Sequence, residues 1–147
     1  MSMRATDEIL QRFALRQTAE RYAVAVDRGD GALFAAQFTP DGELVAPRGV
    51  FAGRDSLSTV PAMMRGLYEK TFHAVLTQVA EIEGDEATAE TYCIARHLYR
   101  DGEQRRMCYE MTIRYQDRFA RLGGAWLFAR RELIVDAAYR FLIEDAR

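Results

Sequence analysis

Cysteine and histidine are rare in this sequence. Two of its 147 residues are cysteine, Cys93 and Cys108, and two are histidine, His73 and His97. Two cysteines inside apolar, strand-like runs are neither a disulfide framework nor a metal-binding pattern. Two histidines with scattered acids also lack the spacing of metal ligands. We therefore expect two small buried thiols and no bound metal.

Long apolar runs and nucleotide-binding signatures are missing as well. No run approaches the roughly 20 apolar residues needed to span a bilayer, and the N-terminal segment has no apolar signal region. There is no glycine-rich fingerprint for a phosphate or dinucleotide, and no serine or cysteine nucleophile motif. The net charge of −2 gives no reason to expect nucleic acid or an anionic membrane as a partner. These absences predict a cytoplasmic protein that works without a cofactor.

What is present is the composition of an ordinary globular domain. Hydrophobic residues make up 49% of the chain and charged residues 29%. The length predicts a single domain over residues 1–147, with a core large enough to fold without disulfides.

The N-terminal segment predicts one long helix over residues 6–28. Thr6 is expected to cap it, and Gly29 supplies the usual C-terminal signal. At 100° per residue, the side expected to face the protein carries Ile9, Phe13, Gln17, Val24 and Asp27.

Shorter elements are expected after this helix. Residues 31–37 predict a short helix, and 38–43 have turn chemistry. Two short strands follow within 43–53. A further helix is expected over 54–70, in which Pro61 is a candidate for the true first turn.

The second half of the chain predicts long antiparallel strands joined by tight turns. Apolar residues are nearly continuous over 73–82, and over 107–116 they alternate with polar ones, as on a half-buried sheet. The expected strands are residues 73–82, 87–99, 107–116 and 126–138.

Helices first and antiparallel strands last indicate the α+β class. Strands of this length must twist and curl. A curled sheet with helices against its concave face makes a cone-shaped α+β barrel, and the inside of the cone is the expected pocket.

Four ionisable residues fall where the pattern favours apolar ones: Asp27, His73, His97 and Arg131. Each has an ordinary structural interpretation. Asp27 fits an acid at the surface end of a helix, and His73 fits a hydrogen-bonded structural histidine. His97 shares its face with small residues, which suits either a pocket wall or tight packing. Arg131 fits a strand arginine that pairs with a neighbouring carboxylate.

Taken together, these residues also fit a catalytic site. An imidazole changes charge near neutral pH, which makes it a useful general base. A carboxylate partner fixes its tautomer and stabilises the imidazolium that forms. Asp27 with His73 would be such a dyad, and His97 or Arg131 would stabilise negative charge or protonate a leaving oxygen. The chemistry left by the absences above is proton transfer without a cofactor: elimination, dehydration or isomerisation.

Several stretches of the sequence resemble one superfamily. They are R-Y-A-V-A-V-D-R-G-D, F-T-P-D-G-E, A-G-R-D, T-F-H-A-V, E-I-E-G-D-E-A-T-A-E-T-Y and W-L-F-A-R-R. From about Asp7 to Val135 the chain resembles the SnoaL-like branch of the nuclear-transport-factor-2-like fold. The resemblance implies a cone made by a strongly bent, largely antiparallel sheet, wrapped by three helices around a pocket. It also implies a homo-dimer or homo-trimer.

Two enzymes of that superfamily, scytalone dehydratase and hexachlorocyclohexane dehydrochlorinase, are described as using an Asp–His dyad. By this resemblance Asp27 and His73 fall on the dyad positions. His97 is similar in placement to a second pocket histidine of the dehydratase, and Arg131 to a strand arginine of the dehydrochlorinase. The dehydratase has a tyrosine directly before its aspartate, where this chain has Val26.

Two functions therefore stay open. The first is a lyase or isomerase acting on a small apolar cyclic or aromatic substrate in the cone. Its expected pocket residues are Phe13, Tyr22, Met63, Met64, Met107, Tyr109, Met111 and Trp126. The second is a non-catalytic small-molecule-binding or structural subunit, like the small subunit of ring-hydroxylating dioxygenases. The outer sheet face, expected to carry Tyr92, Ile94, Leu98, Trp126 and Phe128, would suit burial between subunits.

Overall fold

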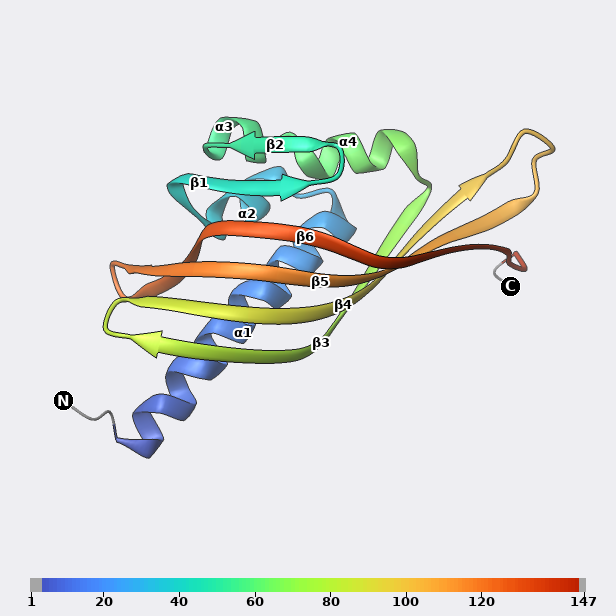
Figure 1. Cartoon of the computed structure of the whole chain (residues 1–147). Helices are drawn as coiled ribbons and strands as arrows, with labels where there is room; N and C mark the ends of the chain where they lie inside the picture. Colours follow the sequence, from blue (N-terminus) through green and yellow to red (C-terminus); the bar gives the residue numbers. More distant parts are fainter. Residues whose placement is uncertain (1–3, 146–147) are drawn as a thin grey trace.

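The computed structural model describes residues 4–145. A long helix, α1 (Ala5–Arg28), comes first, and three short helices follow it in the first half of the chain (Figure 1). These are α2 (Gly31–Ala36), α3 (Arg54–Leu57) and α4 (Val60–Leu67). Two short strands, β1 (Phe38–Ala46) and β2 (Gly49–Ala52), lie between α2 and α3 in the sequence.

Four long strands make up the second half: β3 (Lys70–Glu83), β4 (Glu86–Arg100), β5 (Arg106–Leu122) and β6 (Ala125–Leu142). They join β1 and β2 in one sheet of order β2-β1-β6-β5-β4-β3. Every pairing is antiparallel except that of β1 with β6.

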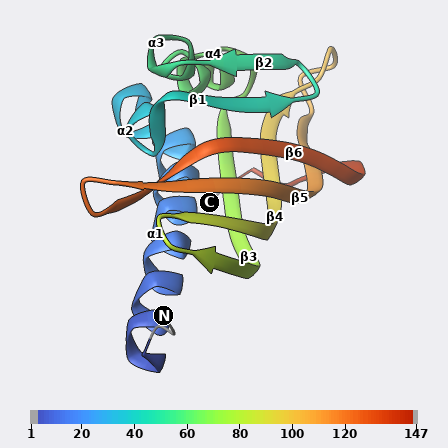
Figure 2. The same ribbon diagram turned by 60° about the vertical axis from the view of Figure 1, so that its left-hand side comes forward.

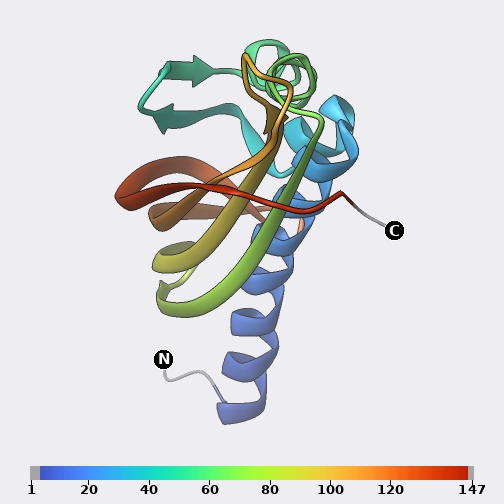
Figure 3. The ribbon, with the colours of Figure 1, turned by 90° about the vertical axis from the view of Figure 1, so that its right-hand side faces the viewer.

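The sheet is strongly curved and stays open, with β2 and β3 as its edges. It bends around α1, which packs against β3 and β6 on the concave side (Figure 3). Helices α3 and α4 lie beside β2 at one end of the sheet, while α1 runs toward the other end (Figure 2). The predicted α+β class is confirmed. The predicted cone, a bent sheet with helices against its concave face, is confirmed as well.

Helix α1 buries a different side from the one expected. Ile9 and Phe13 are 67% and 56% exposed, because the first turns of the helix extend past the edge strand β3 (Figure 1). The buried side instead carries Leu15, Tyr22 and Val26 together with small residues such as Ala19. It also carries Thr18, whose hydroxyl donates to the Trp126 carbonyl at 2.6 Å. Close approach of helix and sheet selects these small side chains, and a hydrophobicity pattern does not report that.

The ends of the helices also differ in part from expectation. Thr6 lies inside α1, and Arg4 occupies the N-cap position without a side-chain cap bond. Gly29 does end the helix, with a left-handed φ of 70°. The helix expected over 54–70 is divided into α3 and α4, and Pro61 lies in the first turn of α4, where a missing N–H costs nothing.

The segment predicted as a turn, residues 38–43, belongs to β1. The register of β1 against β6 shifts between Phe38 and Glu43, so the turn-forming residues make an irregularity inside the strand. A Cβ on Gly42 would lie 2.7 Å from the carbonyl oxygen of Phe128, so glycine is required for this close backbone approach.

A bulge in β6 changes which residues face the core. Phe119 of β5 pairs with Phe128 and Arg118 pairs with Arg130, which leaves Ala129 as an extra residue. The alternation of side chains is therefore shifted by one at this point. As a result Trp126 and Phe128 are buried in the core together with Arg131, and not on the outer face where strict alternation had placed the two aromatic residues.

An ion pair lies in the centre of the core. Arg131 Nε donates to Asp117 Oδ1 at 2.8 Å and Nη2 donates to Oδ2 at 3.2 Å. The two side chains are 1% and 0% exposed. Thr91 donates a further hydrogen bond to Asp117 at 2.8 Å, and the guanidinium lies 3.6 Å from the ring centre of Tyr115 and 4.4 Å from that of Tyr22.

Removing the charge of Asp117 should destabilise the fold strongly. In Asp117→Asn the guanidinium of Arg131 stays buried without a compensating charge, and we expect a loss of about 3–5 kcal/mol in the free energy of unfolding. Urea unfolding followed by circular dichroism measures it. The control is Asp136→Asn, which breaks the exposed pair with Arg114 and should change stability little. Equal effects of the two substitutions would contradict this prediction.

Candidate active site

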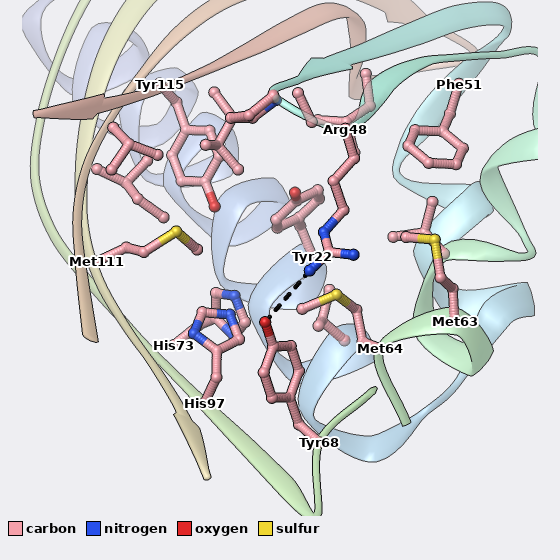
Figure 4. Close-up of a pocket in the computed structure, with 18 of the residues that line it drawn as sticks. Tyr22, Arg48, Phe51, Met63, Met64, Tyr68, His73, His97, Met111 and Tyr115 are labelled. Carbon is pink, nitrogen blue, oxygen red and sulfur yellow. Dashed lines mark hydrogen bonds between the residues drawn. The ribbon is translucent and has the colours of Figure 1, made fainter. Parts of the chain in front are cut away.

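A cavity of about 300 Å³ lies inside the cone, between α1, α4 and the concave face of the sheet (Figure 4). This volume suits a small ligand. The lining is mainly apolar, and its polar groups come from tyrosine, histidine and one arginine. Its residues are Tyr22, Val26, Leu44, Ala46, Pro47, Arg48, Phe51, Val60, Met63, Met64, Tyr68, His73, His97, Tyr109, Met111, Ile113, Tyr115, Leu133 and Val135.

Asp27 and His73 meet at one side of this cavity. His73 Nδ1 lies 2.7 Å from Asp27 Oδ1. Because an ionised carboxylate only accepts hydrogen bonds, Nδ1 carries a proton, and in the neutral ring the opposite nitrogen, Nε2, keeps a free electron pair. The His73 side chain is 7% exposed and lines the cavity, with Asp27 behind it.

Two further hydrogen bonds fix the carboxylate of Asp27. The backbone N–H of His73 donates to Oδ2 at 2.9 Å, and the hydroxyl of Thr71 donates to Oδ1 at 2.9 Å. Partial burial alone would raise the pKa of Asp27, but the hydrogen bonds and charge of His73 and the hydrogen bond of Thr71 lower it below its usual value. Asp27 is therefore a carboxylate at neutral pH, although it lies at the C-terminus of a helix, where the dipole disfavours an anion.

His97 lies beside His73 on the neighbouring strand, with ring centres 5.8 Å apart. Its Nδ1 lies 2.9 Å from the carbonyl oxygen of Tyr109, so Nδ1 is the protonated nitrogen. The side chain is 1% exposed, and its Nε2 has no hydrogen-bond partner among residues 4–145. Burial lowers the pKa of His97 to about 4, and the charge of Arg48, together with that of His73 whenever His73 is protonated, acts in the same direction. The ring is therefore neutral at pH 7 and offers Nε2 as an acceptor.

Arg131 does not line the cavity. Its charge is directed to Asp117, and it contacts the cavity indirectly through the rings of Tyr22 and Tyr115. Burial raises the pKa of Tyr22 to about 12 and holds that of Tyr115 well above its usual range, although the charge of Arg131 opposes both shifts. Both phenols therefore stay protonated, and both line the cavity.

Five of the expected pocket residues line the cavity and three lie elsewhere. Those in the lining are Tyr22, Met63, Met64, Tyr109 and Met111.

The other three have identifiable environments. Phe13 is exposed near the start of α1. Met107 pairs with Leu142 on the part of β5 that extends beyond the cavity. Trp126 is buried in the core and donates from Nε1 to Gln11 at 2.6 Å. The direction of α1 decides the position of Phe13 and the β6 bulge that of Trp126, and neither is visible in the spacing of apolar residues.

Three polar lining residues were not expected from the sequence: Arg48, Tyr68 and Tyr115. Tyr115 could have been found, because it shares the alternating face of Tyr109 and Met111. Arg48 and Tyr68 lie in connections between elements, where residue periodicity carries no information about direction.

Within the part of the chain that the structure describes, His, Cys, Asp and Glu side chains nowhere gather in groups of three or more that could hold a metal ion. Among the helices formed by residues 4–145, none has both the length and the apolar character needed to cross a bilayer.

Known structures share this fold at low sequence identity. A candidate scytalone dehydratase from Novosphingobium aromaticivorans is 22% identical, with a TM-score of 0.81 over 96% of this chain and 95% of that one. A hexachlorocyclohexane dehydrochlorinase from Novosphingobium barchaimii is 14% identical, with a TM-score of 0.79 over 94% of each chain. A protein of unknown function from Mycobacterium tuberculosis is 23% identical, with a TM-score of 0.79 over 92% of this chain and 78% of that one.

The open cone of bent sheet and helices is shared with these structures, which shows a common fold. The model of the SnoaL-like domain matches residues 7–132, and the chain belongs to that family. No curated protein matches the sequence significantly.

The burial of His97 predicts a specific dependence of stability on pH. Its pKa of about 4 in the folded protein lies below the ordinary value of 6.5. Between these values the unfolded chain binds the proton and the folded protein does not, so stability falls as the pH drops from 6.5 toward 4. We expect His97 to account for roughly 2–3 kcal/mol of this loss.

Urea unfolding at pH 7 and at pH 4.5, in wild type and in His97→Gln, isolates the contribution of His97. NMR of the ring protons gives the titration directly, with His73 as the internal comparison. A His97 ring that titrates near pH 6.5, or a pH dependence unchanged in His97→Gln, would contradict the assignment of a neutral buried imidazole.

Proposed function

We propose that the protein is a cofactor-free lyase or isomerase whose general base is His73. It acts on a small apolar cyclic or aromatic substrate held in the cone. The observation that carries the proposal is the 2.7 Å hydrogen bond between His73 Nδ1 and Asp27, which in the neutral ring leaves Nε2 free to accept a proton at an open, mainly apolar cavity.

In this mechanism, Nε2 of His73 removes a proton from a carbon next to a carbonyl group or next to a carbon that bears a leaving group. The electron pair of the broken C–H bond forms a C=C double bond, and the leaving group or carbonyl oxygen takes the displaced electrons. The carboxylate of Asp27 stabilises the imidazolium that results and keeps the ring in its orientation.

The other polar groups of the lining suit the remaining parts of such a substrate. The phenols of Tyr22 and Tyr115 are protonated donors and can stabilise negative charge on oxygen. Nε2 of neutral His97 accepts only, so we assign it to hold a hydroxyl of the substrate and not to protonate it. Arg131 is assigned to position the two tyrosines.

The names of the structural neighbours are consistent with this reaction class, because a dehydratase and a dehydrochlorinase both perform eliminations. Their low identity supports no particular substrate for this chain.

The alternative is a non-catalytic protein that binds a small molecule, or a structural subunit. A cavity of about 300 Å³ that reaches His73 favours a ligand over a purely structural role.

The test is exchange of carbon-bound hydrogen for deuterium in D₂O, followed by mass spectrometry. The probes are cyclic ketones, β-hydroxyketones and halogenated cyclohexanes, and the formation of alkenes is monitored in parallel. For any probe that reacts, His73→Gln should lower the rate by about 10²–10⁴-fold, because the base is lost. Asp27→Asn should lower it as well, since the ring loses its orienting partner.

Glu103→Gln, on the exposed turn between β4 and β5, serves as the control and should leave the rate unchanged. Circular dichroism confirms that the variants are folded. Full activity in His73→Gln would contradict the proposal. Binding of probes without any exchange or elimination would favour the non-catalytic alternative.

A further inference from the structure

Arg48 brings a full positive charge to the mouth of the cavity. It lies in the turn between β1 and β2, which is exposed, and its side chain is part of the cavity lining. Figure 4 shows its guanidinium directed toward Tyr68 on the opposite side. Nη2 of Arg48 donates to the Tyr68 hydroxyl oxygen at 3.4 Å.

Within the described part of the chain, no carboxylate forms an ion pair with Arg48. Among residues 4–145, no Asp or Glu side chain lies within 4.0 Å of the Arg48 nitrogens, and none lines the cavity. Most other arginines of the structure do have such a partner, for example Arg114 with Asp136 and Arg130 with Glu43. The one guanidinium of the lining is thus directed at the ligand space without a partner anion.

Tyr68 adds a second donor at the same place. Its hydroxyl oxygen accepts from Arg48, and its own proton has no acceptor among the residues that the structure describes. The ring is held by contact with His97, with ring centres 4.8 Å apart. Arg48 and Tyr68 therefore lie side by side, and the Tyr68 O–H and the guanidinium N–H groups not bonded to Tyr68 have no acceptor among the described residues.

We propose that Arg48 and Tyr68 form a clamp for a carboxylate, and that the ligand of the cavity is a small ring-containing carboxylic acid. The planar fork of a guanidinium matches the two oxygens of a carboxylate, and a neighbouring O–H completes the set of donors. A phosphate dianion fits less well, because a single cation balances only half of its charge. The proposal rests on the proposed function, since it takes the same cavity as the substrate site and names the class of substrate.

The clamp also gives the substrate a direction. The carboxylate would lie at the mouth, between the β1–β2 turn and the segment after α4. The apolar ring would lie deeper, against residues such as Met64 and Met111, within the cavity that His73 lines. Arg48 is thus a specificity-determining residue, because it selects the charged member of otherwise similar molecules.

The experiment compares acids with their neutral amides of the same shape. The probes are benzoate, cyclohexanecarboxylate and cinnamate, each paired with its carboxamide. Dissociation constants are measured by ligand-detected NMR and calorimetry at pH 7.5 and low salt. In wild type, at least one acid should bind about tenfold more tightly than its amide, and added salt should reduce this preference.

Arg48→Met keeps the length of the side chain and removes the charge. It should abolish the preference for the acid and leave the affinity for the amide unchanged. Arg48→Lys should keep part of the preference, and Tyr68→Phe should lower it by a few-fold. The control is Arg21→Met, which removes an exposed arginine of α1 outside the cavity and should have no effect.

The same measurements in His73→Gln separate this inference from the proposed function, because binding needs no base. A preference for acids that persists there and disappears in Arg48→Met supports the clamp, even if no probe is ever turned over. Exchange activity on neutral ketones without any preference for acids would support the proposed function and overturn the clamp. Absence of the preference in wild type, or its survival in Arg48→Met, also overturns the clamp.

Discussion

The cavity and the candidate site depend on the buried pair of Arg131 and Asp117. Its guanidinium lies against the rings of Tyr22 from α1 and Tyr115 from β5, so one cation joins the long helix to the sheet. Both tyrosines form part of the cavity wall. A buried ion pair is costly to desolvate and tolerates few alternative arrangements. The pair therefore favours one position and orientation of α1 on the sheet. This position of α1 also brings Asp27 to His73, because Asp27 lies about one and a half turns beyond Tyr22 on the same helix.

The polar groups of the cavity lining are of three kinds, namely acceptor nitrogens, donor hydroxyls and one cation, and they lie at different places in the cavity. His73 and His97 each present a nitrogen with a free electron pair, the first backed by a carboxylate and the second by a backbone carbonyl. Tyr22 and Tyr115 present protonated hydroxyls held by burial. Arg48 presents the charge, at the mouth and not in the interior. A ligand that satisfies all three needs an acidic group, an apolar ring and a polar substituent on that ring.

Much of this could be predicted from the sequence, and particular residues show where prediction fails. Asp27 and His73 were proposed as a dyad because a charged residue at a helix end and an imidazole at the start of a strand break the local pattern, and because the resemblance to the superfamily places both on dyad positions. The face of β4 that carries Cys93, Ala95 and His97 was also correct, since strict alternation holds along that strand. The outward placement of Trp126 was wrong, because a single extra residue at Ala129 reverses the alternation. Bulges of this kind depend on the pairing of two strands and leave no mark in either strand alone.

The sequence by itself determined the α+β class, the long curved strands, the two histidines and the absence of nucleotide and disulfide motifs. Local propensity and periodicity suffice for these, because each depends on residues near one another in the chain. Only the tertiary structure decided that Arg131 pairs with Asp117 and that His97 is neutral with a free nitrogen. It alone also decided that Arg48 and Tyr68 meet across the mouth of the cavity. These features depend on burial and on contacts between segments far apart in the sequence, where the energy of a charge or a hydrogen bond is set by the surroundings and not by the residue type.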